Sequence, residues 1–132
     1  MPSYSMGQAA RLLGVSSETV RRWADGGRLG VQRDESGKRV IDGVALARFA
    51  VEHGAGPHAV PEDDVPTSVR NSFVGIVTAV RVDDIAAQVE VQSGPHRPVS
   101  LVTREAVEEP ALEVGVTVTA RVKSTSVDID LP

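Results

Sequence analysis

Two short stretches, far apart in the sequence, carry the side chains whose types and spacing could do chemistry. The first is TSVRNSF, residues 67–73, and the second is RVKS, residues 121–124. Between them they hold hydroxyls, a guanidinium and an ammonium, all of which donate hydrogen bonds. A small oxyanion offers only acceptors, so its site needs donors and little carboxylate. The two stretches therefore indicate an oxyanion site at the ends of a β-rich segment.

A further donor lies between the two stretches. The Thr103 hydroxyl can cap a short helix predicted over residues 104–109, before Pro110. Backbone amides at a helix start also suit an anion. The donors selected from chemistry alone are Ser68, Arg70, Thr103, Lys123 and Ser124.

Three of these donors also have a simpler interpretation, which the sequence leaves open. Thr103 would cap its helix whether or not an anion binds, and Lys123 could be an ordinary outward-facing strand lysine. Arg70 could pair with Glu105 or Asp128.

The sequence contains no recognisable catalytic motif. Its histidines, at positions 53, 58 and 96, sit apart without a spaced cluster of carboxylates, and there is no cysteine. Neither a GxSxG nucleophile motif nor a phosphate-binding loop occurs. We therefore expect that the protein is not an enzyme and holds no metal ion of its own.

Composition divides the chain into unlike parts. Residues 1–56 carry eight basic and six acidic side chains, whereas residues 67–132 carry six basic and nine acidic ones. Only the first part suits a phosphate backbone. No apolar run approaches the roughly 18 residues of a membrane span, so we expect a cytoplasmic protein. Two domains of about 55–65 residues are marginally stable alone, which favours oligomerisation.

The N-terminal part predicts two short helices separated by a tight turn. Residues 7–13 form the first helix, which Gly14 ends, and Ser16 caps the second helix over residues 17–25. The second helix has Val20 and Trp23 on one face. Two helices joined in this way indicate a helix-turn-helix.

Two short strands and a third helix follow. The strands, residues 29–33 and 38–41, flank a turn-rich DESG segment and predict a β-hairpin wing. Asp42 then caps a helix over residues 43–53, which Gly54 ends.

The stretch SMGQAARLLGVSSETVRRWADGGRLG and the later KRVIDGVALARFA resemble the winged helix-turn-helix of the MerR superfamily. Its short excisionase-like branch is most similar, over about residues 5–53. The resemblance implies that the second helix enters the major groove of double-stranded DNA and that the wing contacts the flanking backbone or minor groove. Long dimerisation helices of full-length regulators have no counterpart here, so pairing must come from elsewhere. The implied DNA-binding residues are Ser16, Ser17, Thr19, Arg21, Arg22, Arg33, Lys38 and Arg39.

The sequence leaves two roles open for Arg21 and Arg22 of the second helix. Arg21 or Arg22 could read guanine through its O6 and N7 atoms, as bidentate geometry favours. Alternatively, either arginine is solvated or pairs with Glu18 or Asp25. Trp23 shares a face with Val20, which favours a core position over base stacking.

A linker is predicted between the two parts. Residues 55–66 are rich in proline and acidic residues and show no periodicity. This gives three segments: a DNA-binding domain over residues 1–54, a flexible linker over 55–66, and a second domain over 67–132.

The second domain predicts a small β-barrel. Apolar and polar residues alternate over 85–92, 116–123 and 124–131, and further strands are expected at 73–82 and 98–102. Gly75 is expected to mark a bend. Several short strands with one small helix indicate a barrel of the OB type, so the fold class is α+β with two domains.

The stretches TSVRNSFVGIVTAV, SLVTREAVE and VTARVKSTSVDI resemble the molybdate-binding Mop/TOBE family, over nearly all of residues 67–131. Val69 stands where the family usually has Ala, and Ala106 where it usually has Ser. The resemblance implies a molybdate or tungstate site where neighbouring copies of the domain meet. The implied site residues are Ser68, Arg70, Asn71, Thr103, Lys123 and Ser124.

Together the two parts predict a molybdate- or tungstate-responsive transcriptional regulator. It would form a homo-oligomer, a dimer or a trimer of dimers, through its C-terminal domain. Two alternatives stay open: an oxyanion store, or a DNA-binding protein whose second domain serves only for oligomerisation. The operator and the sign of the ligand effect are not predicted.

Overall fold

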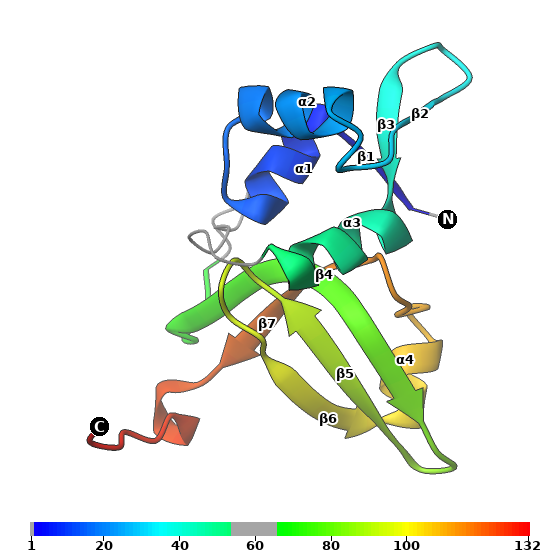
Figure 1. Cartoon of the computed structure of the whole chain (residues 1–132). Coiled ribbons are helices and arrows are strands. Elements are labelled where there is room, and N and C mark those ends of the chain that lie inside the picture. The colour runs from blue at the N-terminus through cyan, green and yellow to red at the C-terminus, as the bar shows by residue number, and fades with distance from the viewer. Residues whose placement is uncertain (1, 54–65) are drawn as a thin grey trace.

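The computed structural model describes residues 2–53 and 66–132 of the chain. An N-terminal unit of helices and a small sheet, called the head, lies above a curled C-terminal sheet, called the tail (Figure 1). The head consists of β1 (Ser3–Ser5), α1 (Met6–Leu13), α2 (Ser17–Asp25), β2 (Gln32–Arg33), β3 (Arg39–Asp42) and α3 (Gly43–Glu52). The tail consists of β4 (Asn71–Val82), β5 (Ala86–Gln92), β6 (Val99–Thr103), α4 (Arg104–Glu108), β7 (Thr117–Val122) and the 3-10 turn η1 (Ser124–Ser126).

Local capping signals set the head's helices, as the sequence predicts. Gly14 ends α1 with φ of 69°, a left-handed conformation that favours glycine. The Ser16 hydroxyl accepts a hydrogen bond of 3.1 Å from the Thr19 amide and so caps α2. The Asp42 carboxylate caps α3 in the same way, through the Ala45 amide at 3.2 Å. α3 ends one residue earlier than predicted, and its expected stop at Gly54 lies outside the described residues.

The wing is a short β-hairpin. Arg33 pairs with Arg39, and the Asp34 carboxylate accepts hydrogen bonds from the backbone amides of Ser36 and Lys38 at 2.9 Å. The first wing strand is shorter than predicted because Leu29 leaves the hairpin and is buried in the head core. The sequence prediction missed β1, which pairs with β3 and completes a three-stranded sheet of order β1-β3-β2.

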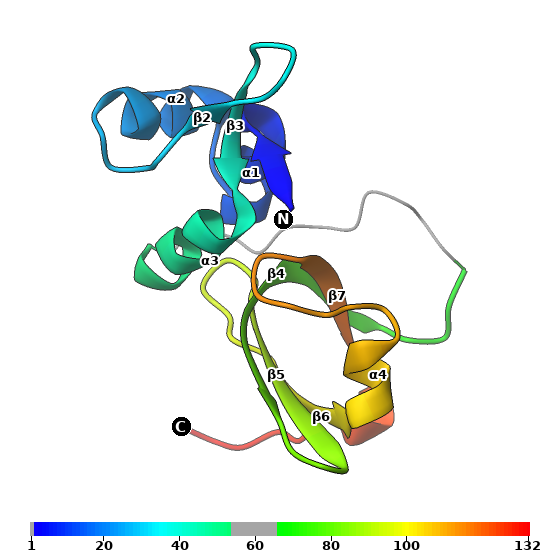
Figure 2. The same cartoon turned by 90° about the vertical axis from the view of Figure 1, so that its right-hand side faces the viewer.

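The tail is an antiparallel sheet of order β6-β5-β4-β7 that curls into a half-barrel (Figure 2). The buried side chains of Val77, Val89, Val91 and Val107 fill its concave side, and α4 lies across one end. Gly75 lies where β4 and β5 approach closely, because a Cβ there would be 2.3 Å from the Gln92 carbonyl oxygen. The small-barrel prediction is therefore confirmed for four strands.

The last predicted strand is wrong for the isolated chain. Residues 124–131 form η1 and then an extended segment with no assigned strand, and Ile129 and Leu131 are 86% and 94% exposed. A strand needs a partner, and this segment runs away from the sheet (Figure 1).

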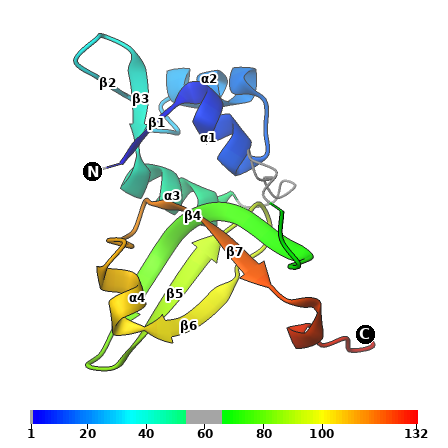
Figure 3. The same ribbon diagram turned by 180° about the vertical axis from the view of Figure 1, so that it is seen from behind.

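Head and tail form a continuous contact (Figures 1 and 3). Helix α3 lies on β4, and Ile76 of β4 belongs to the buried cluster of the head. The Tyr4 hydroxyl donates a 2.6 Å hydrogen bond to the Gly115 carbonyl and accepts one of 2.7 Å from the Thr117 hydroxyl. Within the described ranges, no helix is long and apolar enough to cross a membrane.

Candidate functional sites in the head and tail

The predicted recognition helix and the wing share one side of the head. All three ribbon views place α2 and the β2–β3 hairpin on the side away from the tail sheet (Figures 1–3). Of the predicted DNA-binding residues, Thr19 and Arg39 are half-buried; the exposed ones are Ser16, Ser17, Arg21, Arg22, Arg33 and Lys38. The structure therefore brings this set together on a surface that the tail does not cover.

Several of the predicted DNA-binding residues form hydrogen bonds or ion pairs with one another or with residues close to them. The Thr19 hydroxyl contacts the Ser16 hydroxyl at 2.9 Å and accepts from the Arg22 guanidinium at 3.4 Å. Asp25 pairs at 2.9 Å with Arg39, not with a neighbouring arginine of its own helix. This ion pair connects β3 of the wing to the end of α2.

The arginines of α2 point into solvent. Arg21 and Arg22 are exposed, and neither forms an ion pair with Glu18 or Asp25 among the contacts of the described residues. Trp23 is half-buried, and its ring lies 5.0 Å from that of Phe49, which confirms its core position. Arg33 donates to the Gly37 carbonyl at 2.7 Å inside the wing, and so helps to shape the hairpin.

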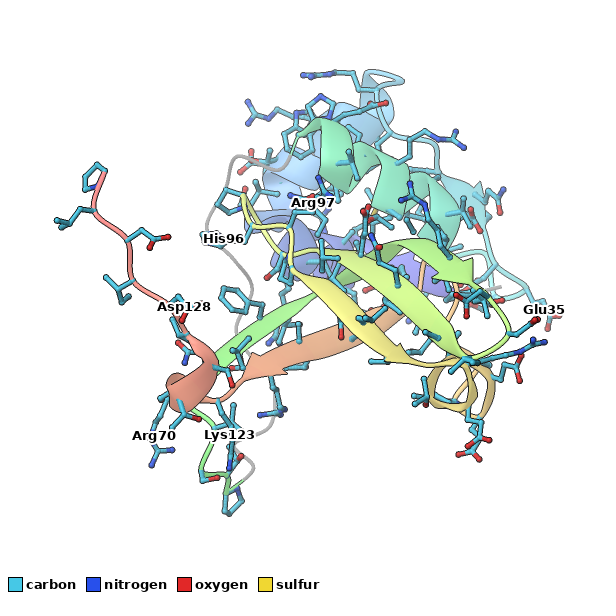
Figure 4. All side chains as sticks on the ribbon, turned by 90° about the horizontal axis from the view of Figure 1, so that it is seen from below. Glu35, Arg70, His96, Arg97, Lys123 and Asp128 are labelled. Carbon is cyan, nitrogen blue, oxygen red and sulfur yellow. The ribbon has the colours of Figure 1, made fainter. Side chains whose placement is uncertain are left out.

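The two oxyanion stretches meet at one end of the tail sheet. Asn71 opens β4 and pairs with Val122, the last residue of β7, and its side-chain amide donates to the Val122 carbonyl at 3.2 Å. Lys123 and Ser124 follow at once, so they lie beside Ser68 and Arg70. Figure 4 shows Arg70 and Lys123 at this same end of the molecule.

The donors at this end face solvent. Ser68, Arg70, Lys123 and Ser124 are exposed. Arg70 donates to the Thr67 carbonyl at 2.9 Å, which holds the loop before β4. In residues 66–132 it makes no ion pair with Glu105 or Asp128, so its charge remains available to an anion.

Thr103 lies apart from the other five predicted residues. It ends β6 and pairs with Ala86, near the end of β4 that is opposite to Asn71. Its hydroxyl accepts from the Ala106 amide at 3.2 Å and caps α4, a helix of only five residues. Within one chain, the structure therefore does not bring Thr103 to the Arg70–Lys123 end.

The sequence analysis missed Tyr4, a residue that connects the head to the tail. Tyr4 is 9% exposed and joins the head to β7, the strand that ends at the oxyanion residues. No local pattern marks it, because its partners lie 111 and 113 positions away. A cluster of three or more His, Cys, Asp or Glu side chains suited to a metal ion is not found in the part of the chain that the structure describes.

Comparison with known proteins agrees with this division. A helix-turn-helix domain model matches residues 3–53, and a TOBE domain model matches residues 67–129. No curated protein matches the chain significantly.

Several solved structures match the chain, and two of them are similar to its C-terminal half. MopII from Clostridium pasteurianum is 31% identical, with half of this chain and all of that chain covered and a TM-score of 0.47. A molybdate-binding protein from Sporomusa ovata is 24% identical, with 51% of this chain and all of that chain covered and a TM-score of 0.49. In its C-terminal half the chain belongs to the TOBE domain family, and in its N-terminal half it carries a helix-turn-helix domain.

Proposed function

We propose that this protein is a molybdate- or tungstate-responsive transcriptional regulator. One observation supports this best: a single chain joins a helix-turn-helix domain to a TOBE domain. The second helix of the first domain has exposed arginines, and the second domain has exposed hydrogen-bond donors for an anion at one end of its sheet. The protein similar to the tail that is described as molybdate-binding, from Sporomusa ovata, agrees with this choice of ligand. The protein would act in the cytoplasm, where operator DNA is accessible.

The head supplies the contact with DNA. In the MerR- or excisionase-like mode, α2 enters the major groove and the wing follows the backbone. Arg21 and Arg22, which are exposed, would contact base edges, while Ser16 and Ser17 at the start of α2 would contact phosphate oxygens. Lys38 on the wing adds an attraction to the backbone that does not depend on sequence.

The tail supplies the contact with the oxyanion. Molybdate and tungstate are tetrahedral dianions that accept hydrogen bonds at every oxygen, and Ser68, Arg70, Lys123 and Ser124 offer donors from adjacent loops. Because these donors are exposed and Thr103 lies elsewhere, one chain alone does not enclose an anion. The complete site would form between copies of the tail in a homo-oligomer.

Binding of the anion would stabilise this assembly. Cationic side chains gathered at a junction of copies repel one another until an anion neutralises them, so the ligand favours the assembled state. Assembly then sets how the heads are presented to paired half-sites on DNA.

Calorimetric titration of molybdate into the purified protein, in a large excess of sulfate, tests the ligand. We expect saturable binding at micromolar or tighter affinity, weakened at least tenfold by Arg70→Ala or Lys123→Ala. Arg81→Ala, which removes an exposed arginine of β4 at the other end of the sheet, is the matched control. A flat trace with the natural sequence would refute the oxyanion role and leave the tail as an oligomerisation domain.

A second experiment tests the regulator. The protein selects its preferred sites from a random duplex library, and the affinity for them is measured with and without molybdate. A regulator changes its affinity when molybdate is added, whereas an oxyanion store binds the anion and leaves DNA affinity unchanged. We expect Arg21→Ala to weaken binding to the selected site by about 5- to 150-fold, the range of a lost bidentate base contact.

A further inference from the structure

Strands β4 and β7 form a ribbon that connects the oxyanion donors to the head. Their register begins with Asn71 opposite Val122, beside the donors. It ends, five positions further on, with Ile76 opposite Thr117. At about 3.4 Å for each residue, the ribbon is about 17 Å long. Figure 3 shows β7 running beside β4 from a point close to α3 toward the C-terminus, so one end of the ribbon lies against the head.

Apolar packing holds the head on this end of the ribbon. Ile76 is 1% exposed and belongs to the buried cluster of the head, and Val74 and Val114 of the tail pack against the same cluster. The hydrophobic effect follows the buried area and has no preferred direction. These contacts therefore resist separation of head and tail more strongly than they resist a rotation of one on the other.

A buried tyrosine supplies directional contacts at the same place. The Tyr4 hydroxyl donates to the Gly115 carbonyl at 2.6 Å and accepts from the Thr117 hydroxyl at 2.7 Å. Both bonds need a defined distance and angle, so they constrain the orientation of the head. Gly115 is itself fixed to β4, because its amide donates to the Val77 carbonyl at 2.9 Å. Tyr4 is thus bonded to the beginning of β7, the strand that ends at the oxyanion donors.

Two glycines bring the backbones of head and tail into direct contact near these bonds. A Cβ on Gly43 would be 2.7 Å from the Gly115 carbonyl oxygen, and a Cβ on Gly115 would be 2.8 Å from the Gly43 carbonyl carbon. Gly43 directly follows β3, the second strand of the wing. The strand that leads to the oxyanion donors therefore begins where the wing strand ends.

The head connects Tyr4 to its DNA-binding elements. Tyr4 lies on β1 and is paired with Ile41 of β3. Arg39 of the same strand forms the ion pair with Asp25 at the end of α2. Strand pairing and an ion pair thus connect Tyr4 to both the wing and the recognition helix.

We propose that Tyr4 is the positioning residue through which the oxyanion site affects the affinity of the head for DNA. Its hydroxyl holds the head in one orientation on the β4–β7 ribbon, so assembly of the tails around an anion also orients the heads. Tyr4 is buried and touches neither the anion nor DNA; it acts through β7 on one side and β3 on the other. Without the hydroxyl both ligands still bind, but each loses its effect on the other. This inference deepens the proposed function and rests on it.

The mutual effect of the two ligands tests this role in the full chain. Calorimetry gives the dissociation constant of molybdate for the protein alone and for the protein saturated with its selected duplex, and the ratio of the two constants is the coupling factor. Linkage requires the same factor in the affinity for DNA with and without molybdate, which provides an independent measurement. In the natural sequence we expect a factor of about 5–150, and in Tyr4→Phe a factor below about 2. The affinity of Tyr4→Phe for molybdate in the absence of DNA should stay unchanged.

Two further variants separate this role from a general loss of stability. Thr117→Val removes only one of the two bonds of Tyr4 and should give an intermediate coupling factor. Asp83→Ala, at the turn between β4 and β5, removes hydrogen bonds to the Ile85 and Ala86 amides and is the matched control. It should keep the natural factor, because a ratio taken within one protein cancels the effect of the lost charge.

A Tyr4→Phe protein with the natural coupling factor would overturn the proposal, as would an equal loss of coupling in Asp83→Ala. Failure of the proposed function gives a different result. If the natural sequence binds no molybdate, or binds it equally well with and without DNA, the regulator itself is refuted and the role of Tyr4 with it.

Discussion

Replacing Tyr4 with phenylalanine tests the two hydrogen bonds through which Tyr4 joins the head to the tail. The substitution removes one hydroxyl and keeps the ring, which is buried in the head core. It breaks two hydrogen bonds, the 2.6 Å bond to the Gly115 carbonyl and the 2.7 Å bond from the Thr117 hydroxyl. The Gly115 carbonyl is left at a buried position without that donor.

The expected loss of stability follows from these two bonds. Each contributes roughly 1 kcal/mol net, and the buried carbonyl adds a desolvation penalty, so we expect a total of about 2 kcal/mol. For a chain of this length that corresponds to a fall in melting temperature of about 4–8 °C. Thr117→Val removes only the second bond and should cost about 1 kcal/mol.

The assay uses two probes during urea unfolding. Trp23 is the only tryptophan, so its fluorescence reports the head, while far-ultraviolet circular dichroism reports the secondary structure of head and tail together. The two transitions should coincide in the natural sequence, and the Tyr4→Phe protein should unfold earlier in the fluorescence signal. The double variant Tyr4→Phe/Thr117→Val should be about as stable as Tyr4→Phe alone, because both changes break the same bond. Unchanged midpoints in Tyr4→Phe would refute the assignment of this contact.

Three further substitutions or titrations test local features. Gly43→Ala would place a Cβ 2.7 Å from the Gly115 carbonyl oxygen, so we expect about 1–3 kcal/mol of lost stability, whereas Gly30→Ala, with open space around it, should be neutral in the same urea titration. Ser16→Ala removes the cap of α2 and should lower stability by about 1 kcal/mol; a helix signal that melts as before would contradict the cap. The Ser36 hydroxyl and the backbone amide of Lys38 lower the pKa of the Asp34 carboxyl, so the wing keeps this contribution at neutral pH and loses it as pH falls below about 3.9 and through the lowered value. Carboxyl carbon chemical shifts measured against pH would contradict this if Asp34 titrated at or above its ordinary value.

The parts of the fold that the sequence predicted well are those set by neighbours in the chain. A cap such as Ser16 or Asp42 needs only the amide three residues on, and Gly14 needs only its own backbone conformation. Both helices of the helix-turn-helix were therefore predicted to within one residue. The two oxyanion stretches were paired correctly because the predicted barrel brings their strands together.

What the sequence could not supply depends on distant partners. β1 is only three residues long and is stabilised by β3, more than thirty positions later. Thr103 was grouped with donors at the other end of the sheet, because residue type does not show which end of a strand a residue occupies. The alternation of residues 125–131 predicts a strand but does not show which other strand it would pair with. In the isolated chain, residues 125–131 are assigned to no strand.

In the proposed regulator, the contact at Tyr4 and Gly43 would fix the orientation of the DNA-binding head relative to the tail barrel. A head on a loose tether would reach half-sites over a range of distances, but a head fastened to its barrel shares the barrel's orientation. In an assembly, the separation and rotational phase of the recognition helices are then set by protein geometry. Under the proposed function, half-sites would have to face the same side of the duplex at multiples of about 10.5 base pairs, and five inserted base pairs would turn one of them away. The spacing of an operator thus becomes part of its identity.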